Sequence, residues 1–268
     1  MCDKSGHVII NLMLLLSVLL GLVPGFAWLI FYLSEDPHPE PKRLIVYTFI
    51  VGIVSGFFTI IIEELFNAAT AAVGIPSLAA LTQIIQTSAG GAAAATGIDA
   101  TTILQLLFLL LGLAAIEELM KFSAAYFAVG KSPELDEPID AMIYMIVAAL
   151  GFATLENIGA ITNVAAAAAS GQGAIFVNIF ETVSLRFVGA TLLHSLTSAI
   201  VGYHWALGIM HKKVPHYLAS GLIFATILHA CFNYLILNYA PIGYSVLFLL
   251  VIGFFVLNDF EKLKVAPA

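Results

Sequence analysis

Long apolar segments alternate with short polar connections along the whole chain. Each segment is long enough for a transmembrane helix, because about 20 apolar residues cross the hydrocarbon core of a bilayer. The segments span roughly residues 8–33, 44–66, 102–129, 139–169, 175–210, 217–239 and 242–258. Membrane barrels instead show short strands of alternating polarity. We therefore predict an all-α fold, a polytopic bundle of about seven membrane-spanning helices that forms one domain over residues 1–268.

The composition supports an integral membrane protein. Hydrophobic residues make up 61% of the chain and charged residues only 10%. The first segment is too long for the apolar part of a signal peptide and lacks a clear cleavage site, so we interpret it as a retained helix. Cys2 and Cys231 show no disulfide or zinc-finger spacing. The net charge of −7 lies largely in connections such as 132–140 and gives no reason to expect a nucleic-acid partner.

The basic residues predict how the bundle is oriented. Loops on the cytoplasmic side of a membrane are enriched in Lys and Arg. Most of the ten basic residues lie in alternate connections or in the C-terminal tail, namely Lys42, Arg43, Lys131, Lys212, Lys213, Lys262 and Lys264. Lys4 is an exception, and Lys121 and Arg186 lie within apolar segments. We therefore expect the N-terminus outside and the C-terminus in the cytoplasm.

The connection at 67–101 is long and rich in small residues. Leu78, Leu81 and Ile85 recur within it at helical spacing, which suits a short helix on the outer leaflet or a flap over a cavity. An ordered but inert loop is the alternative.

Several polar residues lie inside the apolar segments, where an ionised side chain costs about 2.5–3.5 kcal/mol and usually has a function. They are Glu117, Glu118, Lys121, Glu156, Asn157, Glu181, Arg186, His194, His229 and Asn233. Depth along a helix follows from its rise of 1.5 Å per residue. Glu117 and Glu118 then lie about 17–20 Å from the cytoplasmic end, His229 about 18 Å, and Glu156 and His194 about 25 Å. We expect these residues of four helices to meet in one layer.

The residue types at this depth suit the activation of water. Lys121 follows Glu118 by three residues and Glu117 by four, so either carboxylate can pair with it. Because adjacent helical residues point in different directions, we expect one Glu at the reacting centre and the other as its support. That Glu can act as a general base with His194, while His229 and Asn233 stabilise an oxyanion.

Two alternatives remain open from the residues alone. His194, His229 and Glu118 can bind zinc, because two imidazoles, a carboxylate and a water form an established hydrolytic set; otherwise no cofactor is expected. A proton-coupled carrier can instead use buried acids and bases as a relay, and a non-catalytic membrane scaffold can keep them without turnover.

Two further motifs favour structural interpretations. Glu63 and Glu64 repeat the Ile-Glu-Glu-Leu string, but lie about 29 Å from the cytoplasmic end, where carboxylates are solvated cheaply. We interpret them as a surface pair, with gating or substrate entry as the alternative. Gly52 and Gly56 form a GxxxG pattern that indicates helix packing.

The order of these motifs resembles the PrsW family of intramembrane proteases. The resemblance runs from Ile116 to Asn233 and consists of Glu117-Glu118-Leu-Met-Lys121, Asp140, Gly151-Phe152-Ala153 before Glu156-Asn157, Arg186 with His194, and His229 with Asn233. That family is similar to the CAAX prenyl proteases and bacteriocin-processing membrane proteases, which share a Glu-Glu motif and two later His motifs. The long connection at 67–101 has no counterpart that we can map.

The resemblance implies an endopeptidase that cuts a membrane-anchored protein in or near the bilayer of a prokaryotic cell. It implies an anti-sigma factor as substrate in the PrsW branch, and a prenylated protein in the CAAX branch. Glu117, Glu118, His194, His229 and Asn233 match the catalytic motifs. Lys121, Glu156, Asn157, Arg186 and Asp140 match supporting positions. The family has been described as metal-dependent and as glutamate-type, so both mechanisms stay open, and we expect the catalytic core at about 102–239.

Overall fold

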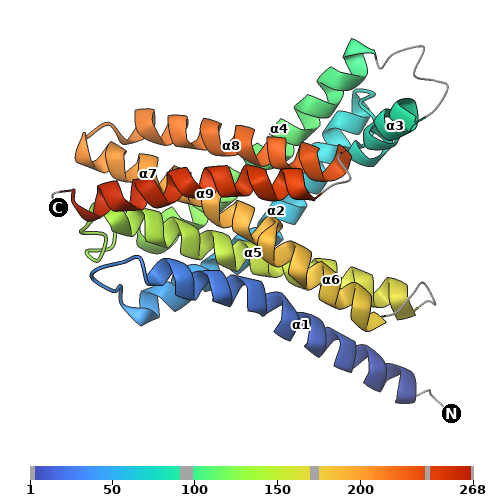
Figure 1. The fold of residues 1–268 in the computed structure, drawn as a ribbon, viewed down its shortest axis with the longest axis horizontal. Coiled ribbons are helices and arrows are strands. Elements are labelled where there is room, and N and C mark those ends of the chain that lie inside the picture. Colours follow the sequence, from blue (N-terminus) through green and yellow to red (C-terminus); the bar gives the residue numbers. More distant parts are fainter. Residues whose placement is uncertain (1–3, 91–98, 170–174, 239–241, 267–268) are drawn as a thin grey trace.

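The computed structural model describes residues 4–90, 99–169, 175–238 and 242–266 and contains helices but no strand within these ranges (Figure 1). In chain order the helices are α1 (Lys4–Leu33), α2 (Lys42–Ala72), α3 (Leu78–Gly90), α4 (Ala100–Val129), α5 (Pro138–Ala169), α6 (Ile175–Val188), α7 (Ala190–Met210), α8 (Val214–Asn238) and α9 (Gly243–Lys264). Within the described residues, seven segments are long and apolar enough to cross a membrane, with α6 and α7 forming one of them. The predicted all-α membrane bundle is confirmed.

Helix α5 lies at the centre of the bundle and packs mainly against α1, α2 and α7. Its side chains from Ile139 to Ala153 are almost all buried, including Tyr144 and Phe152. The other membrane-spanning helices expose many large apolar side chains, such as Ile30, Phe57 and Phe254. In a membrane protein these faces lie against lipid, so the buried surface of α5 marks the true interior.

Glycines allow the backbones of α2 and α5 to come into direct contact. A Cβ atom on Gly52 would lie 2.1 Å from the carbonyl oxygen of Ala148, and one on Gly151 would lie 2.0 Å from that of Phe49. Small residues at such crossings are how helices pack closely in membranes. The packing role predicted for Gly52 is confirmed, and the same contact fixes α5 beside the site described below.

A Gly151→Ala substitution is expected to destabilise the bundle, because the added methyl group meets the backbone of α2 and forces the two helices apart. Overpacking of this kind costs about 1–3 kcal/mol. Gly159→Ala is the matched control, since a Cβ at that position of α5 meets nothing within 4 Å. Thermal unfolding in detergent, followed by circular dichroism, should show a lower midpoint only for Gly151→Ala. Equal midpoints would contradict the close packing.

Two details differ from or refine the sequence predictions. The span predicted over 175–210 is confirmed as one apolar segment long enough to cross a membrane, but its helix is interrupted at Gly189, whose φ of −110° and ψ of −99° leave the helical range. A Cβ on Gly189 would lie 2.5 Å from the carbonyl oxygen of Leu185, so the interruption suits only glycine. The helix predicted around Leu78 to Ile85 is confirmed as α3, with Leu81 buried against α4.

The connections that carry basic residues lie at one end of the bundle. The α1–α2, α4–α5 and α7–α8 connections are at the same end as the C-terminus, and α1 begins at the opposite end (Figure 1). This arrangement suits the charge distribution, and the cytoplasmic position of that end stays a prediction.

Candidate active site

Glu118 is the most deeply buried carboxylate of the site and is held by three helices. Its Oε1 atom accepts hydrogen bonds from Lys121 Nζ at 2.7 Å on α4 and from Thr197 Oγ1 at 2.9 Å on α7. The same oxygen lies 2.8 Å from His229 Nδ1 on α8. Both Glu118 and Lys121 have no solvent exposure. Glu118 therefore ties α4, α7 and α8 together and balances the ammonium charge inside the membrane domain.

His229 lies between the two adjacent glutamates. Its Nδ1 atom faces Glu118, while its Nε2 atom lies 3.6 Å from Glu117 Oε2. Glu118 accepts the proton of Nδ1 and so leaves the Nε2 lone pair directed at Glu117. Glu117 and Glu118 point in different directions because they are adjacent on a helix. The His229 ring lies between them, with one nitrogen toward each carboxylate.

His194 has a similar arrangement on the other side of Glu117. Its Nδ1 atom lies 3.0 Å from Lys121 Nζ and 3.8 Å from Glu117 Oε2. Because Lys is only a donor, Nδ1 accepts and Nε2 carries the proton, which it donates to Glu156 Oε2 at 2.9 Å. The two imidazole rings are 5.2 Å apart, so both histidines converge on Glu117.

Glu156 is itself held by a cation and an amide. Arg186 on α6 donates from Nη2 to Glu156 Oε2 at 2.8 Å and from Nε to Asn157 Oδ1. Asn157 is fully buried and also bonds Thr191 at the start of α7. The break at Gly189 thus lets Arg186 and His194 reach the same carboxylate from two helices. Glu181, the other acid near Arg186 in sequence, is exposed on α6.

Glu117, His194 and His229 form a set of side chains that fits a metal ion. One ligand atom from each lies within 4.8 Å of the others, and all three residues are buried. Glu117 Oε2 is buried without a hydrogen-bond partner among the described residues, which leaves this oxygen available as a ligand atom. We expected Glu118 as the carboxylate of this set. The structure brings Glu117 to it instead, because Glu118 Oε1 already accepts bonds from Lys121, Thr197 and His229.

Asn233 and Asp140 lie in different places. Asn233 follows His229 by one turn of α8, is half-buried, and lines a cavity together with Glu117. Asp140 lies about 24 Å from Glu156 along α5 at 1.5 Å per residue. Its Oδ2 atom accepts from the backbone amides of Asp136 and Glu137, at 3.0 Å and 2.6 Å, and so stabilises the α4–α5 connection. Asp140 is therefore not brought to the site.

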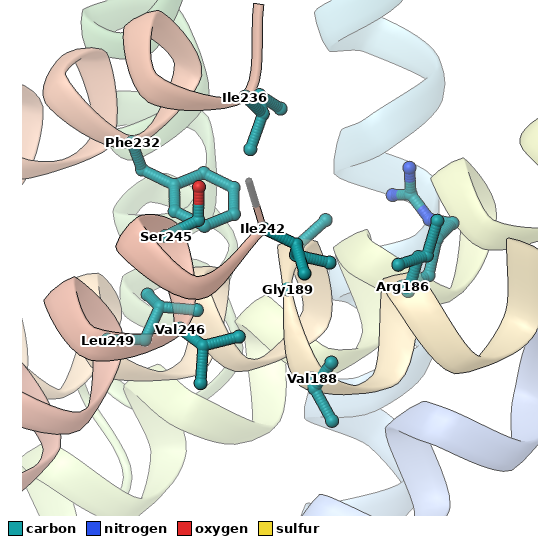
Figure 2. A pocket seen from close by; sticks show the side chains of 11 residues that line it. Arg186, Val188, Gly189, Phe232, Ile236, Ile242, Ser245, Val246 and Leu249 are labelled. Atoms are coloured by element: carbon teal, nitrogen blue, oxygen red, sulfur yellow. The ribbon is translucent and has the colours of Figure 1, made fainter. Parts of the chain in front are cut away.

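A second cavity of about 350 Å³ lies behind Arg186. Figure 2 shows its apolar walls, with Phe232 and Ile236 of α8 and Val246 and Leu249 of α9 opposite the α6–α7 junction. Ile236 lines both cavities, so they flank the same end of α8.

Comparison with known proteins shows what this chain is similar to. The family model described as "PrsW family intramembrane metalloprotease" matches residues 40–258, which include every helix that contributes to the site. The chain belongs to the PrsW family. It is also 27% identical to the "Protease PrsW" of Geobacillus kaustophilus (strain HTA426) over 247 residues, covering 91% of this chain and 90% of that protein. No solved structure matches.

Membership in the PrsW family makes this chain an integral membrane protease of a type known from bacteria. Its substrate is accordingly a membrane protein, and the lipid bilayer is its setting. A carrier or an inert scaffold is no longer needed to explain the buried charges. The sequence analysis did not single out Thr197, and it favoured a surface role for Glu63. Thr197 contacts Glu118, and Glu63 lines the cavity beside Glu117. Glu63 and Asn67 are four residues apart on α2 and so lie on the same face of the helix. This spacing was the sequence signal that could have indicated a role for Glu63 in the cavity.

Proposed function

We propose that Glu117 is the reacting carboxylate of this protease, which hydrolyses a peptide bond of a membrane-anchored protein within or beside the bilayer. The observation that supports this role is the position of Glu117 Oε2. It is buried, has no hydrogen-bond partner among the described residues, and faces one nitrogen of each histidine at 3.6 Å and 3.8 Å. It also lines a cavity of about 340 Å³.

We propose zinc as the metal, held by Glu117, His194 and His229. Two imidazoles and one carboxylate, with a position left for water, are the ligand set of several hydrolytic zinc enzymes. When bound, zinc supplies Lewis acidity that polarises a carbonyl group and acidifies a water molecule. Ligation through His194 Nδ1 requires Lys121 to give up its 3.0 Å contact and keep its bond to Glu118.

The residues around His194 and His229 determine which ring nitrogen of each histidine carries the proton. Glu118 accepts the Nδ1 proton of His229, so the Nε2 lone pair of that ring is left toward Glu117. Glu156 accepts the Nε2 proton of His194, so Nδ1 of that ring has its lone pair on the side of Lys121 and Glu117. Carboxylates that orient histidines in this way are typical of metal sites and raise the basicity of the ligand nitrogen. Arg186 and Asn157 position Glu156, and Lys121 positions Glu118. We assign no proton transfer to these five residues.

Asn233 is proposed as the donor to the oxyanion of the tetrahedral intermediate. Its amide lies on the cavity wall with Glu117, one turn from His229, and no hydrogen bond occupies it among the described residues. A preorganised amide donor stabilises developing negative charge in a site that excludes water. The proposed substrate is a membrane-anchored regulatory protein such as an anti-sigma factor, which follows from the family resemblance and not from the cavity.

Three proteins purified in detergent and reconstituted into liposomes test this assignment. The wild-type chain is expected to contain about one zinc ion, as three protein ligands and an open position imply. His229→Ala should lose the metal and all cleavage of a membrane-anchored reporter. Asn233→Ala should keep the metal and lose about two to three orders of magnitude in rate. Full activity in the presence of a strong chelator would contradict the zinc assignment and leave Glu117 as the general base acting alone.

A further inference from the structure

A cavity of about 340 Å³ leads from the surface of the bundle to Glu117. Its polar lining residues are Glu63 and Asn67 on α2, Glu117 on α4 and Asn233 on α8, and apolar side chains of α3, α4 and α8 complete the wall. This volume lies within the range of about 300–1,000 Å³ that is typical of ligand pockets. Under the function proposed above, a substrate in this cavity has its scissile bond at Glu117 and neighbouring side chains near Glu63.

The charges around the cavity do not balance. Glu118 pairs with Lys121, and Glu156 pairs with Arg186. Glu117 faces the two histidines and belongs to the metal set. Glu63 is half-buried, and no hydrogen bond or ion pair of its side chain occurs within the described part of the chain. The earlier interpretation of Glu63 and Glu64 as a surface pair therefore fits only Glu64, which is exposed and does not line the cavity.

An acid in this position favours a cation. Glu63 lines the same cavity as Glu117 but lies outside the metal set, so its carboxylate, when ionised, gives this part of the cavity a negative potential. Low-dielectric walls concentrate such a potential and raise the local concentration of a positively charged ligand. No basic side chain among the described residues lines this cavity, so a substrate can supply the cation that pairs with Glu63.

We propose that Glu63 is a specificity-determining residue that binds a Lys or Arg side chain of the substrate close to the scissile bond. This rests on the proposed function, because it takes Glu117 as the reacting centre. Asn67 lies one turn further along α2 on the same wall, so its amide oxygen can accept a second hydrogen bond from the same cation. The cavity behind Arg186 has no comparable negative charge to offer, since its walls are mainly apolar (Figure 2). Arg186 on its wall is a cation that is paired with Glu156.

Binding to full-length protein in nanodiscs tests this without requiring turnover. The protein has the Glu117→Gln substitution, so that no peptide is cut. The probes are fluorescent transmembrane peptides that differ at one of six successive positions flanking the apolar span, where each carries either Lys or the neutral Nε-acetyllysine. At one position or two adjacent ones, Lys should bind about tenfold more tightly, as one charged hydrogen bond implies. Adding Glu63→Gln should remove this difference.

Matched variants make the result decisive. Glu64→Gln should keep the full preference for Lys, because Glu64 is exposed outside the cavity. Glu63→Lys should reverse the preference in favour of peptides with Glu at the same position, which also shows that the variant is folded. A preference for Lys that survives Glu63→Gln, or no such preference at any position in the presence of Glu63, would overturn the proposal. Cleavage of the same peptides by protein with intact Glu117 is measured in parallel, and its absence would count against the proposed function alone.

Discussion

Glu117→Gln is expected to reduce peptide hydrolysis by about three orders of magnitude or more, as removal of a reacting group does in other hydrolases. The substitution keeps the size of the side chain and removes the charge that can bind a metal or accept a proton from water. Stability should not fall, because Glu117 Oε2 has no hydrogen-bond partner to lose among the described residues. Cleavage of a membrane-anchored reporter in liposomes measures the rate, and thermal unfolding in detergent measures the stability.

Glu64→Gln is the control for this experiment. Glu64 belongs to the second Ile-Glu-Glu-Leu string and is exposed, so its substitution should leave the rate and the unfolding midpoint unchanged. If Glu117→Gln retained more than about a tenth of the wild-type rate, general base and metal roles for Glu117 would both be excluded, since either contributes at least about a hundredfold.

The meeting of four helices at one site could be predicted from the sequence. Charged side chains in a membrane need partners, and counting residues along each helix placed Glu117, Glu156, His194 and His229 at similar depths. The structure confirms this meeting, with His194 and His229 each facing Glu117. Depth was sufficient here because these four residues lie on helices that surround the same interior.

The division of roles between Glu117 and Glu118 could not be predicted. Both can reach Lys121 on a regular helix, and only the packing of α7 and α8 decides which carboxylate receives Thr197 and His229. The depth estimate also did not predict that Glu63 lies beside the site. A count along α2 gives a distance from the membrane surface but no lateral position, and α2 packs against α4 so that Glu63 lines the cavity beside Glu117.

Glu118→Leu is expected to destabilise the protein and to reduce its activity. The substitution leaves the ammonium group of Lys121 fully buried without a carboxylate, and breaking a buried ion pair in this way costs about 3–5 kcal/mol. It also removes the acceptor that holds the Nδ1 proton of His229, so the Nε2 lone pair is no longer fixed toward Glu117. Thermal unfolding in detergent should show a clearly lower midpoint than that of Glu117→Gln.

The double variant Glu118→Leu, Lys121→Met separates the two effects. With both charges replaced by apolar side chains of similar size, most of the lost stability should return, because such replacements of buried pairs are often neutral or stabilising. Hydrolysis should stay about 10–100-fold below that of the wild type, the usual effect of removing the partner that orients a metal-ligating histidine. A double variant as unstable as Glu118→Leu would show that the ion pair does not explain the loss. Full activity in a stable double variant would show that Glu118 does not position His229.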